Sequence, residues 1–403
     1  MLNFTYKARD LASNSVVHST VQAQSEAEAG KLLMARNLVP LEITPESDRS
    51  NPLSNLRSRI TTKDRVVFTR QLATLINAGL PLSQSLRTVQ DQTTNKKLQS
   101  IIQDIISSVE GGSTLADAFA RHTIFDELFI SLIAAGEISG TLDKSLERIA
   151  NQQEKDAEIA NKVRGAMVYP GIVLFVILGV VVFMLTTVVP QIENLYDSLG
   201  KELPILTKIM VTAADILQKF WWLIIMILIG LGFYLHHYIM TDVGRKQFDG
   251  LKLNVPLFGD LFQKLYMARF TRTGETLLLS GVQMLEMLRI AGRSTGNVLV
   301  RDSVMKAAEK VKTGKTLSES LKPEDYILSL VPQMIGIGEQ SGQIDGMMGK
   351  AATFYENEVD NAIRTISTAI EPVLMVVLAV VAGGMVGAIL LPIYSLVGSN
   401  GIT

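Results

Sequence analysis

Three long runs of apolar residues constrain this chain more than any other feature of its sequence. No Asp, Glu, Lys or Arg occurs between Arg164 and Glu193, between Lys219 and Asp242, or after Glu371. Each run is long enough to cross a hydrocarbon layer of about 30 Å at 1.5 Å per residue. A large soluble core rarely holds three such runs. We therefore expect a membrane protein with three spanning helices, at 165–192, 220–241 and 370–394.

Much of the rest of the chain is duplicated at a spacing of 202 residues. GEISG at 136–140 recurs as GEQSG at 338–342, and FTRQLATLINAG at 68–79 recurs as FTRTGETLLLSG at 270–281. A constant offset across scattered matches indicates an internal repeat, and the period is far longer than that of a solenoid. The sequence therefore predicts two copies of one domain, each ending in a span, at about 60–192 and 262–394.

Composition excludes several classes of function. The chain of 403 residues has no cysteine, which rules out disulfides, thiol nucleophiles and Cys-ligated metal sites. Its formal net charge is −1, so no overall basic field points to nucleic-acid binding. The first ten residues, MLNFTYKARD, lack an apolar core of the signal-peptide kind, so we expect insertion to use an internal apolar run.

The pattern of helix starts, breaks and apolar spacing predicts an all-α membrane protein. We expect two repeated six-helix bundles and three transmembrane helices, preceded by a small α+β module. The predicted parts outside the spans are the module 1–46, a linker 47–60, helical domain 1 at 61–164, an amphipathic segment 193–219, helical domain 2 at 242–368, and a tail 395–403. In the amphipathic segment, one face carries Ile205, Ile209, Ile216 and Phe220.

Charges around the runs predict how the chain crosses the membrane. Lys155, Lys162 and Arg164 precede the first run and Arg245 follows the second, whereas the tail after Glu371 has no Lys or Arg. Cytoplasmic flanks carry such an excess of basic residues. If each copy consisted of one domain and one span, two successive copies would place their domains on opposite sides of the membrane. The unrepeated second span adds a crossing that returns the second domain to the side of the first. We expect the N-terminus and both helical domains in the cytoplasm, and 193–219 and the C-terminus outside.

The duplicated GE.SG motif is the main candidate site. Glu137 and Glu339, between glycines, invite a metal-binding interpretation with nearby acids, but the favoured interpretation is a helix–helix corner. There Gly140 and Gly342 adopt positive φ and each glutamate is a cap or an ion-pair partner. We assign structural roles in the repeat to Gly136, Glu137, Ser139, Gly140, Gly338, Glu339, Ser341, Gly342, Arg70 and Arg272. We predict no catalytic residue and no cofactor.

Two further motifs have simple structural interpretations. GKT at 314–316 lacks the glycine that a phosphate loop needs five positions earlier, where Glu309 stands, so we interpret it as a helix N-cap turn. In the third run Ala379, Gly383 and Gly387 recur at four-residue steps, a pattern that lets helix backbones approach closely in membranes. Whether this face packs within one chain or between chains stays open.

A twice-repeated helical domain with a GE.SG turn, each copy ending in a span bounded by prolines (Pro170 and Pro190, Pro372 and Pro392), resembles the PilC/GspF family. The resemblance covers essentially the whole chain. It implies a non-enzymatic inner-membrane platform of a type IV pilus or type II secretion machine. The implied partners are a hexameric cytoplasmic assembly or retraction ATPase, pilins or pseudopilins, other inner-membrane components, and further copies of the chain. The alternatives are a polytopic membrane transporter, disfavoured by the lack of ionisable groups in the spans, and a receptor subunit.

Overall fold

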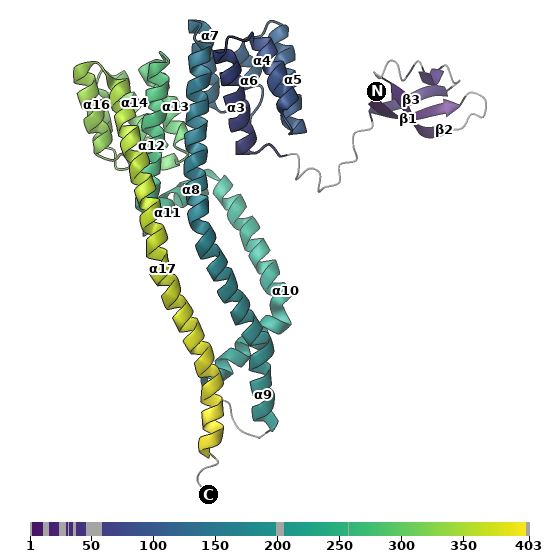
Figure 1. Ribbon diagram of the computed structural model, residues 1–403, viewed down its shortest axis with the longest axis vertical. Helices are drawn as coiled ribbons and strands as arrows, with labels where there is room; N and C mark the ends of the chain where they lie inside the picture. The colour runs from purple at the N-terminus through teal and green to yellow at the C-terminus, as the bar shows by residue number, and fades with distance from the viewer. Residues whose placement is uncertain are drawn as a thin grey trace. The chain divides into compact units, whose positions relative to one another are not determined.

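The computed structural model describes residues 2–10, 16–23, 30, 32–34, 38–45, 59–198, 205–256 and 258–399. The chain divides into two compact units, Met1–Arg65 with Gln90–Gln103 and Val66–Val89 with Asp104–Thr403. The expected fold class is confirmed, because helices dominate the described residues and three of them are long and apolar enough to cross a membrane (Figure 1).

The N-terminal part contains a three-stranded antiparallel sheet. Strands β1 (Leu2–Asp10), β2 (Val16–Ala23) and β3 (Leu38–Pro45) lie in the order β2-β1-β3. Ala8 in the central strand and Leu33 in a short helical turn are buried. Between the second and third strands, only residues 30 and 32–34 are described, and they are helical.

The first helical domain begins with the capping box that its sequence predicts. The N–H of Thr61 donates to Asp64 Oδ2 at 2.8 Å and the N–H of Asp64 donates to Thr61 Oγ1 at 3.2 Å. Six helices follow: α3 (Thr62–Asn77), α4 (Leu82–Gln92), α5 (Lys96–Glu110), α6 (Leu115–Ala120), α7 (Glu127–Ser139) and α8 (Leu142–Phe183). Part of the core is a cluster of rings, because Phe119 lies 4.6 Å from Phe125 and 4.8 Å from Phe129, centroid to centroid.

The second helical domain repeats the scheme of the first. Its helices are α11 (Asp242–Asn254), α12 (Phe258–Leu279), α13 (Met284–Ser294), α14 (Val298–Lys312), α15 (Leu317–Leu321), α16 (Leu330–Ser341) and α17 (Ile344–Ser399). Subtracting 202 carries α13 onto 82–92 and α14 onto 96–110, the bounds of α4 and α5. The positions of Phe119 and Phe129 become Leu321 and Val331, which are buried in turn. The repeat therefore preserves burial while changing the side chains that provide it.

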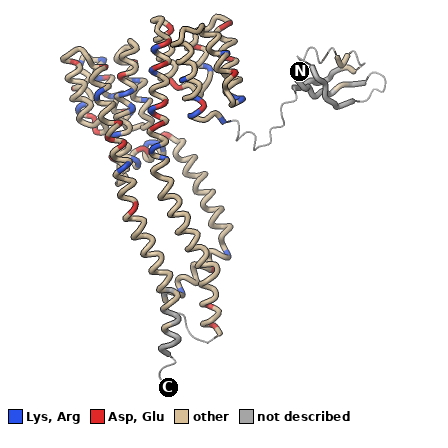
Figure 2. The backbone as a smooth tube through the Cα atoms, in the orientation of Figure 1, with Lys and Arg blue, Asp and Glu red and all other residues tan. Residues whose placement is uncertain are grey.

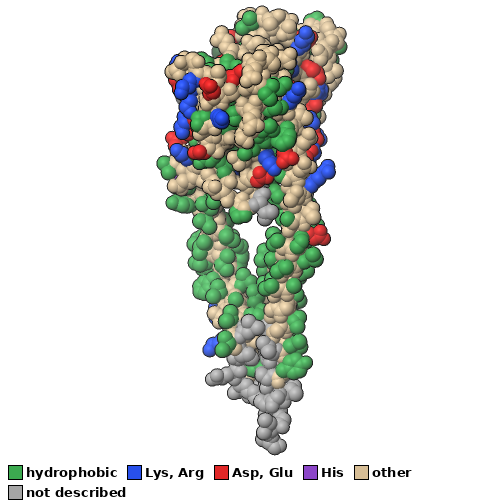
Figure 3. Space-filling model, turned by 90° about the vertical axis from the view of Figure 1, so that its left-hand side faces the viewer, with side chains coloured by type: hydrophobic (Ala, Val, Ile, Leu, Met, Phe, Trp, Pro, Cys, Tyr) green, Lys and Arg blue, Asp and Glu red, His purple; other side chains and the backbone are tan. Residues whose placement is uncertain are grey.

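Two helices continue from the helical domains into the apolar runs. α8 is 42 residues long and α17 is 56 residues long, and neither is interrupted where the polar part ends (Figure 1). The remaining apolar helix is α10 (Ile205–Met240), which has a kink at Phe220. Large apolar side chains cover the surface of the three helices, as Figure 3 shows for one side. Their exposure fits a surface solvated by lipid.

The helix that contains the first apolar run continues past residue 192, the boundary drawn for the first span from the sequence. After α8 the helix continues through a π-helical turn, η1 (Met184–Val188), into α9 (Val189–Ser198). Pro190 has no N–H to donate to the carbonyl of Thr186, and the side-chain amide of Gln218 on α10 donates to that carbonyl at 3.4 Å. A π-turn beside a proline and an amide from a neighbouring helix keep the backbone paired without ending the helix.

The amphipathic segment forms the end of one helix and the start of another. Its helical parts are α9 and the first turns of α10. Val211 and Ala214 of α10 pack against Val189, while Ile205 and Ile209, on the apolar face singled out from the sequence, are exposed. The early part of α10 is therefore apolar on two faces, and the described part of the chain covers one of them.

Candidate functional site

In the first copy of the GE.SG motif, each residue has a distinct structural contact. α7 ends at Ser139, and Gly140 follows with φ of 69° in the left-handed region. The carboxylate of Glu137 reaches back to the N-terminus of α6, where it accepts the N–H of Leu115 at 2.8 Å and that of Ala116 at 3.2 Å. Gly136 allows close approach, because a Cβ there would lie 2.4 Å from the hydroxyl of Ser145.

The second copy has the same geometry. Gly342 has φ of 71°, and Glu339 accepts the N–H of Leu317 at 2.5 Å and that of Ser318 at 3.4 Å. A Cβ on Gly338 would lie 2.7 Å from the Cα of Ile344. Both glutamates therefore satisfy N–H groups that a helix N-terminus leaves without intrahelical partners. The serines of both copies bond their own helices, Ser139 Oγ to the carbonyl of Ala135 at 2.6 Å and Ser341 Oγ to that of Ile337 at 2.9 Å.

The metal interpretation of Glu137 and Glu339 finds no further ligands nearby. Among the described residues, no group of three or more His, Asp and Glu side chains could hold a metal ion. The GKT stretch forms a turn with Gly314 at φ of 95°, and Thr316 Oγ1 then accepts the N–H of Glu319 at 3.3 Å as the N-cap of α15. These contacts give the two motifs a structural role.

Arg70 links the first helix of its domain to the helix that enters the membrane. Its guanidinium on α3 donates to Glu154 at 2.6 Å, to Glu147 at 2.8 Å and to Asn151 at 2.6 Å, all on α8. The hydrogen bond from Arg70 lowers the pKa of the Glu154 carboxyl, and the same bond raises the pKa of Arg70. The arrangement fixes α8 against α3 by several charge-assisted hydrogen bonds.

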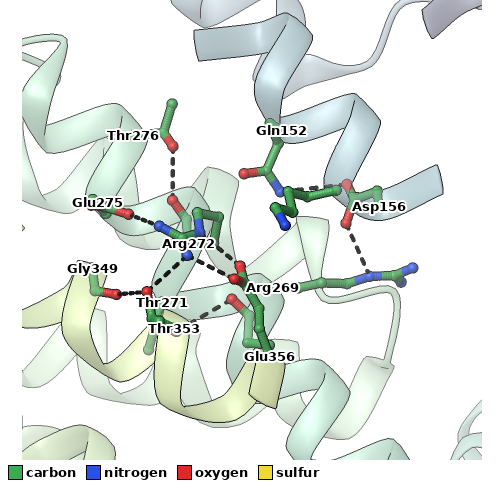
Figure 4. Close-up of polar contacts among 12 residues, drawn as sticks. Gln152, Asp156, Arg269, Thr271, Arg272, Glu275, Thr276, Gly349, Thr353 and Glu356 are labelled. Carbon is green, nitrogen blue, oxygen red and sulfur yellow. Dashed lines mark hydrogen bonds and ion pairs between the residues drawn. The ribbon is translucent and has the colours of Figure 1, made fainter. Parts of the chain in front are cut away.

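Arg272 makes the same kind of contact in the second copy, but one of its two carboxylate partners comes from a different helix. It donates to Glu356 of α17 at 2.8 Å and to Glu275 of its own helix α12 at 2.6 Å (Figure 4). The position that corresponds to Glu147 is Gly349, where an added Cβ would lie 2.1 Å from a carboxylate oxygen of Glu275. The second carboxylate partner of the arginine lies on the long helix α8 in the first copy and on α12 in the second. Gly349 of α17 makes room for it there.

Between the two helical domains lies a polar contact that does not follow the repeat. Asp156 of α8 faces Arg269 of α12 at 3.8 Å and accepts a hydrogen bond from the side-chain amide of Gln152 at 3.4 Å (Figure 4). Loss of hydration at this half-buried position raises the pKa of Asp156. The positions 202 residues away hold Glu358 and Val67, so this pair joins the copies rather than recurring in each.

Other contacts extend this junction in both directions. Farther from the apolar runs, Glu127 of α7 contacts Arg289 and lies 3.1 Å from Arg293, both on α13. Toward the runs, Ile159 of α8 packs with Leu261, Val359, Ile363 and Ile366 of the second domain. We call the set Glu127, Asp156, Ile159, Arg269, Arg289 and Arg293 the domain junction. Sequence analysis missed it, although the break in the repeat at Val67 and Arg269 was a usable signal.

The small-residue face of the third run is not in contact with another helix of this chain at Gly383. A Cβ added there would meet no atom within 4 Å among the described residues. Ala379 is exposed and Gly387 is half-buried on the same helix, α17. The close packing that this spacing favours is therefore not made at Gly383 within the described chain.

Comparison with known proteins matches one family model twice. The model of type II secretion system (T2SS) protein F matches residues 68–190 and 270–392. The two matches are separated by 202 residues at both ends, because 270 − 68 and 392 − 190 give the same difference. The repeat predicted from the sequence is thereby confirmed.

Relatives align with nearly the whole chain. The type IV pilus assembly protein PilC of Thermus thermophilus is 37% identical over 406 residues, which cover 98% of this chain and 98% of the relative. The type II secretion system protein F of Pseudomonas aeruginosa is 33% identical over 402 residues, with 98% and 99% covered. A type IV pilus assembly protein PilC from Myxococcus xanthus is 40% identical over 338 residues, with 84% and 81% covered.

Proposed function

This chain belongs to the family of type II secretion system protein F, and from that premise we propose that it is the inner-membrane platform of a type IV pilus or type II secretion machine. Its relatives carry the names of both kinds of machine, which the sequence alone does not separate. The platform would couple a cytoplasmic assembly or retraction ATPase to the insertion of pilins or pseudopilins into a filament, or to their extraction. Further copies of the chain are proposed to assemble with it.

The observation that carries this proposal is the continuity of α8 and α17. Each long helix takes part in the packing of a helical domain at one end and passes without a break into an apolar span at the other. An α-helix is hydrogen-bonded within itself along its whole length, so movement of one end is transmitted to the other. The Arg70 and Arg272 contacts fix α8 to α3 and α17 to α12. A force on the domains would therefore reach the spans.

Contact between the helical domains supports the proposed orientation. Glu127 with Arg293 and Ile159 with Val359 join the two domains directly, so both must lie on one side of the membrane. An even number of crossings must then separate them, which the first span and α10 supply. We propose that this side is the cytoplasm and that the C-terminus lies outside, in agreement with the distribution of basic residues.

A binding and hydrolysis experiment tests the proposed role. The full chain, purified and placed in nanodiscs, is expected to retain the assembly ATPase of the same organism and to hydrolyse no ATP itself. Empty nanodiscs provide the control for retention, and the ATPase alone provides the reference for hydrolysis. ATP turnover by the purified chain, or failure to retain the ATPase, would contradict the platform role.

A further inference from the structure

A small pocket in the second helical domain is lined by three arginines. Arg245 comes from α11, Arg293 from the end of α13 and Arg301 from α14, and the turn 296–298 completes the lining. The pocket has a volume of about 170 Å³. Three helices, of which α13 and α14 are consecutive in the sequence, thus bring arginines to one place, and no acidic residue lines it.

One of the three cations at this pocket has no carboxylate partner. Within the described part of the chain, Arg245 has no carboxylate at ion-pair distance. Arg293 lies 3.1 Å from Glu127, and Arg301 pairs at 2.9 Å with the adjacent residue, Asp302. The carboxylates that pair with Arg293 and Arg301 do not line the pocket, so an anion between the three guanidinium groups would relieve the repulsion that remains among them.

Backbone N–H groups at this place are already satisfied. The N–H of Val298 donates to Asp249 Oδ2 at 3.0 Å, and those of Leu299 and Val300 donate to Asn297 Oδ1 at 2.9 and 3.2 Å. The start of α14 is therefore fully capped by the protein itself. Any anion in the pocket would be held by the guanidinium groups.

We propose that this pocket binds a phosphate group carried by a small ester. Guanidinium forks match the geometry of phosphate oxygens and can bind them in pairs. The volume suits one phosphate with a short polar substituent, whereas pockets for larger ligands begin at about 300 Å³. Two sources share this chemistry, the headgroup of an acidic phospholipid and a free phosphate or phosphate ester.

The position of the pocket brings the lipid source within reach. α11 begins at Asp242, directly after α10 ends at Met240, so Arg245 lies within one helical turn of the end of an apolar run. Lys and Arg positions cluster along the backbone at this level, where the apolar helices leave the helical domains (Figure 2). Basic pockets at the cytoplasmic end of spans are typical binding sites for acidic headgroups.

The repeat provides an internal comparison for these arginines. Subtracting 202 carries Arg293 onto Asp91 and Arg301 onto Gln99, while Asn297 falls on Asn95, which is again an asparagine. The first copy forms both corresponding helices, α4 and α5, without either arginine. Folding of a single copy therefore does not require Arg301, which favours a role in binding, whereas Arg293 also contributes to the domain junction through Glu127.

Titration of the full chain in a zwitterionic detergent tests the site. Its ligands are a short-chain phosphatidylglycerol, the phosphatidylcholine of the same chain length, and inorganic phosphate. Arg245→Gln and Arg301→Gln are each expected to weaken binding of the phosphate-bearing ligand about tenfold, through loss of one charge-assisted contact. Lys246→Gln is the matched control, because it removes the same charge from the neighbouring residue of α11 without changing the pocket. Melting without ligand checks that every variant is folded.

Each result decides the matter. Saturable binding of phosphatidylglycerol that the arginine variants weaken and Lys246→Gln leaves within twofold establishes the site with a lipid source. The same pattern with inorganic phosphate establishes it with a free source. Equal weakening by Lys246→Gln would mean that diffuse charge attracts the anion and would overturn the proposal. If neither phosphatidylglycerol nor inorganic phosphate binds saturably, the proposal is also overturned.

Discussion

At Gly140 and Gly342 the backbone turns with φ of 69° and 71°, a conformation that strains any residue with a branched Cβ. An added Cβ at either position would meet no atom within 4 Å, so strain alone sets the cost of a substitution. The first glycine of each motif differs, since a Cβ on Gly136 or Gly338 would collide with a neighbouring side chain or backbone. The glycine one residue before each glutamate and the glycine three residues after it are thus required for different reasons.

Replacing the last glycine of either motif tests this assignment. Gly140→Val and Gly342→Val are each expected to lower the free energy of unfolding by about 1 kcal/mol or more, because a β-branched residue resists positive φ. Gly346→Ala is the control, since Gly346 lies inside α17 with ordinary φ and open space, and this change should be neutral or slightly stabilising. Unchanged melting of both valine variants in detergent would contradict the corner.

The pKa shifts of Asp156 and Glu154 predict that their contributions to stability respond to pH in opposite directions. The pKa of Asp156 is raised above 3.8 in the folded protein, mainly by loss of hydration, so between the unfolded and folded pKa the folded state binds more protons. Its contribution to stability therefore falls as pH rises through that window. Glu154 has a pKa lowered from 4.5 by Arg70, so its contribution is present above that value and is lost as pH falls through the folded pKa.

Melting temperatures from pH 3 to pH 7 measure both effects. The stability of Asp156→Asn relative to the parent should increase as pH rises, because the variant avoids ionising a half-buried group. Glu154→Gln should show the reverse, with a deficit at neutral pH that disappears in acid. The two residues lie on the same helix, so each variant controls for the other. Parallel pH profiles of the two variants would contradict the assignment.

At the scale of the element, the long helix α8 continues through the π-helical turn η1 into the short helix α9 despite two prolines. Pro170 lies inside α8, and Pro190 follows η1 at the start of α9. The carbonyl freed by Pro190 belongs to Thr186 and accepts from Gln218 of α10. A side chain from one apolar helix therefore completes the backbone of another.

Substitution of Gln218 and of Pro190, separately and together, tests the contact between the Gln218 amide and the Thr186 carbonyl. Gln218→Leu should lower stability in detergent by about 1 kcal/mol, because it leaves the Thr186 carbonyl without a donor. Pro190→Ala restores an N–H at the right position, so the loss caused by Gln218→Leu should be smaller in the Pro190→Ala background. Equal losses in both backgrounds would show that the amide does not pair with this carbonyl.

Breaking α8 between the domain and the membrane tests rigid coupling. Ala157→Pro removes one backbone hydrogen bond and should cost about 3 kcal/mol locally. We expect the variant to insert and to retain the ATPase but to assemble no filament. Ala157→Gly is the control, because it lowers helix propensity by about 1 kcal/mol without removing a donor. Normal filament assembly by the proline variant would contradict coupling through this helix.

At the scale of the whole molecule, the crossing pattern follows from the duplication and the domain junction. Each copy ends in a span, and α10 supplies the additional crossing between them. Without that crossing the two domains would lie on opposite sides of the membrane and could not form the contacts of Glu127 with Arg289 and Arg293. An unrepeated span is therefore a requirement of two copies that touch.

Labelling of single cysteines measures this topology directly, because the natural chain has none. Ala120→Cys and Lys322→Cys should react with a membrane-permeant reagent only, as expected for the cytoplasmic side. Gly200→Cys and Ser399→Cys should react with an impermeant reagent in intact cells. Labelling after lysis controls for accessibility at each position. A C-terminal cysteine protected in intact cells and exposed by lysis would contradict three crossings with the N-terminus inside.

The sequence alone determined the features that depend on local pattern. Three apolar runs predicted the spans, and the 202-residue offset predicted the duplication. Caps such as Thr61 with Asp64 predicted the helix starts. Each of these signals depends on residues close together in the sequence or on the same residue type recurring at a fixed spacing. For the two GE.SG corners, the sequence predicted the positive φ of the last glycine of each motif. Which N–H groups the glutamates would meet was open, because α6 and α15 lie more than twenty residues earlier in the chain.

Only the tertiary structure decided how the copies meet. Asp156 with Arg269, and the amide of Gln218 with the carbonyl of Thr186, join helices separated by long stretches of chain. Glu275 can take the place of Glu147 because Gly349 of the distant helix α17 leaves room for it. The pocket of Arg245, Arg293 and Arg301 is of the same kind. Periodicity shows which face of a helix is apolar, but not which neighbour covers it. Those pairings depend on how whole helices pack, and the two copies pack differently where they face each other.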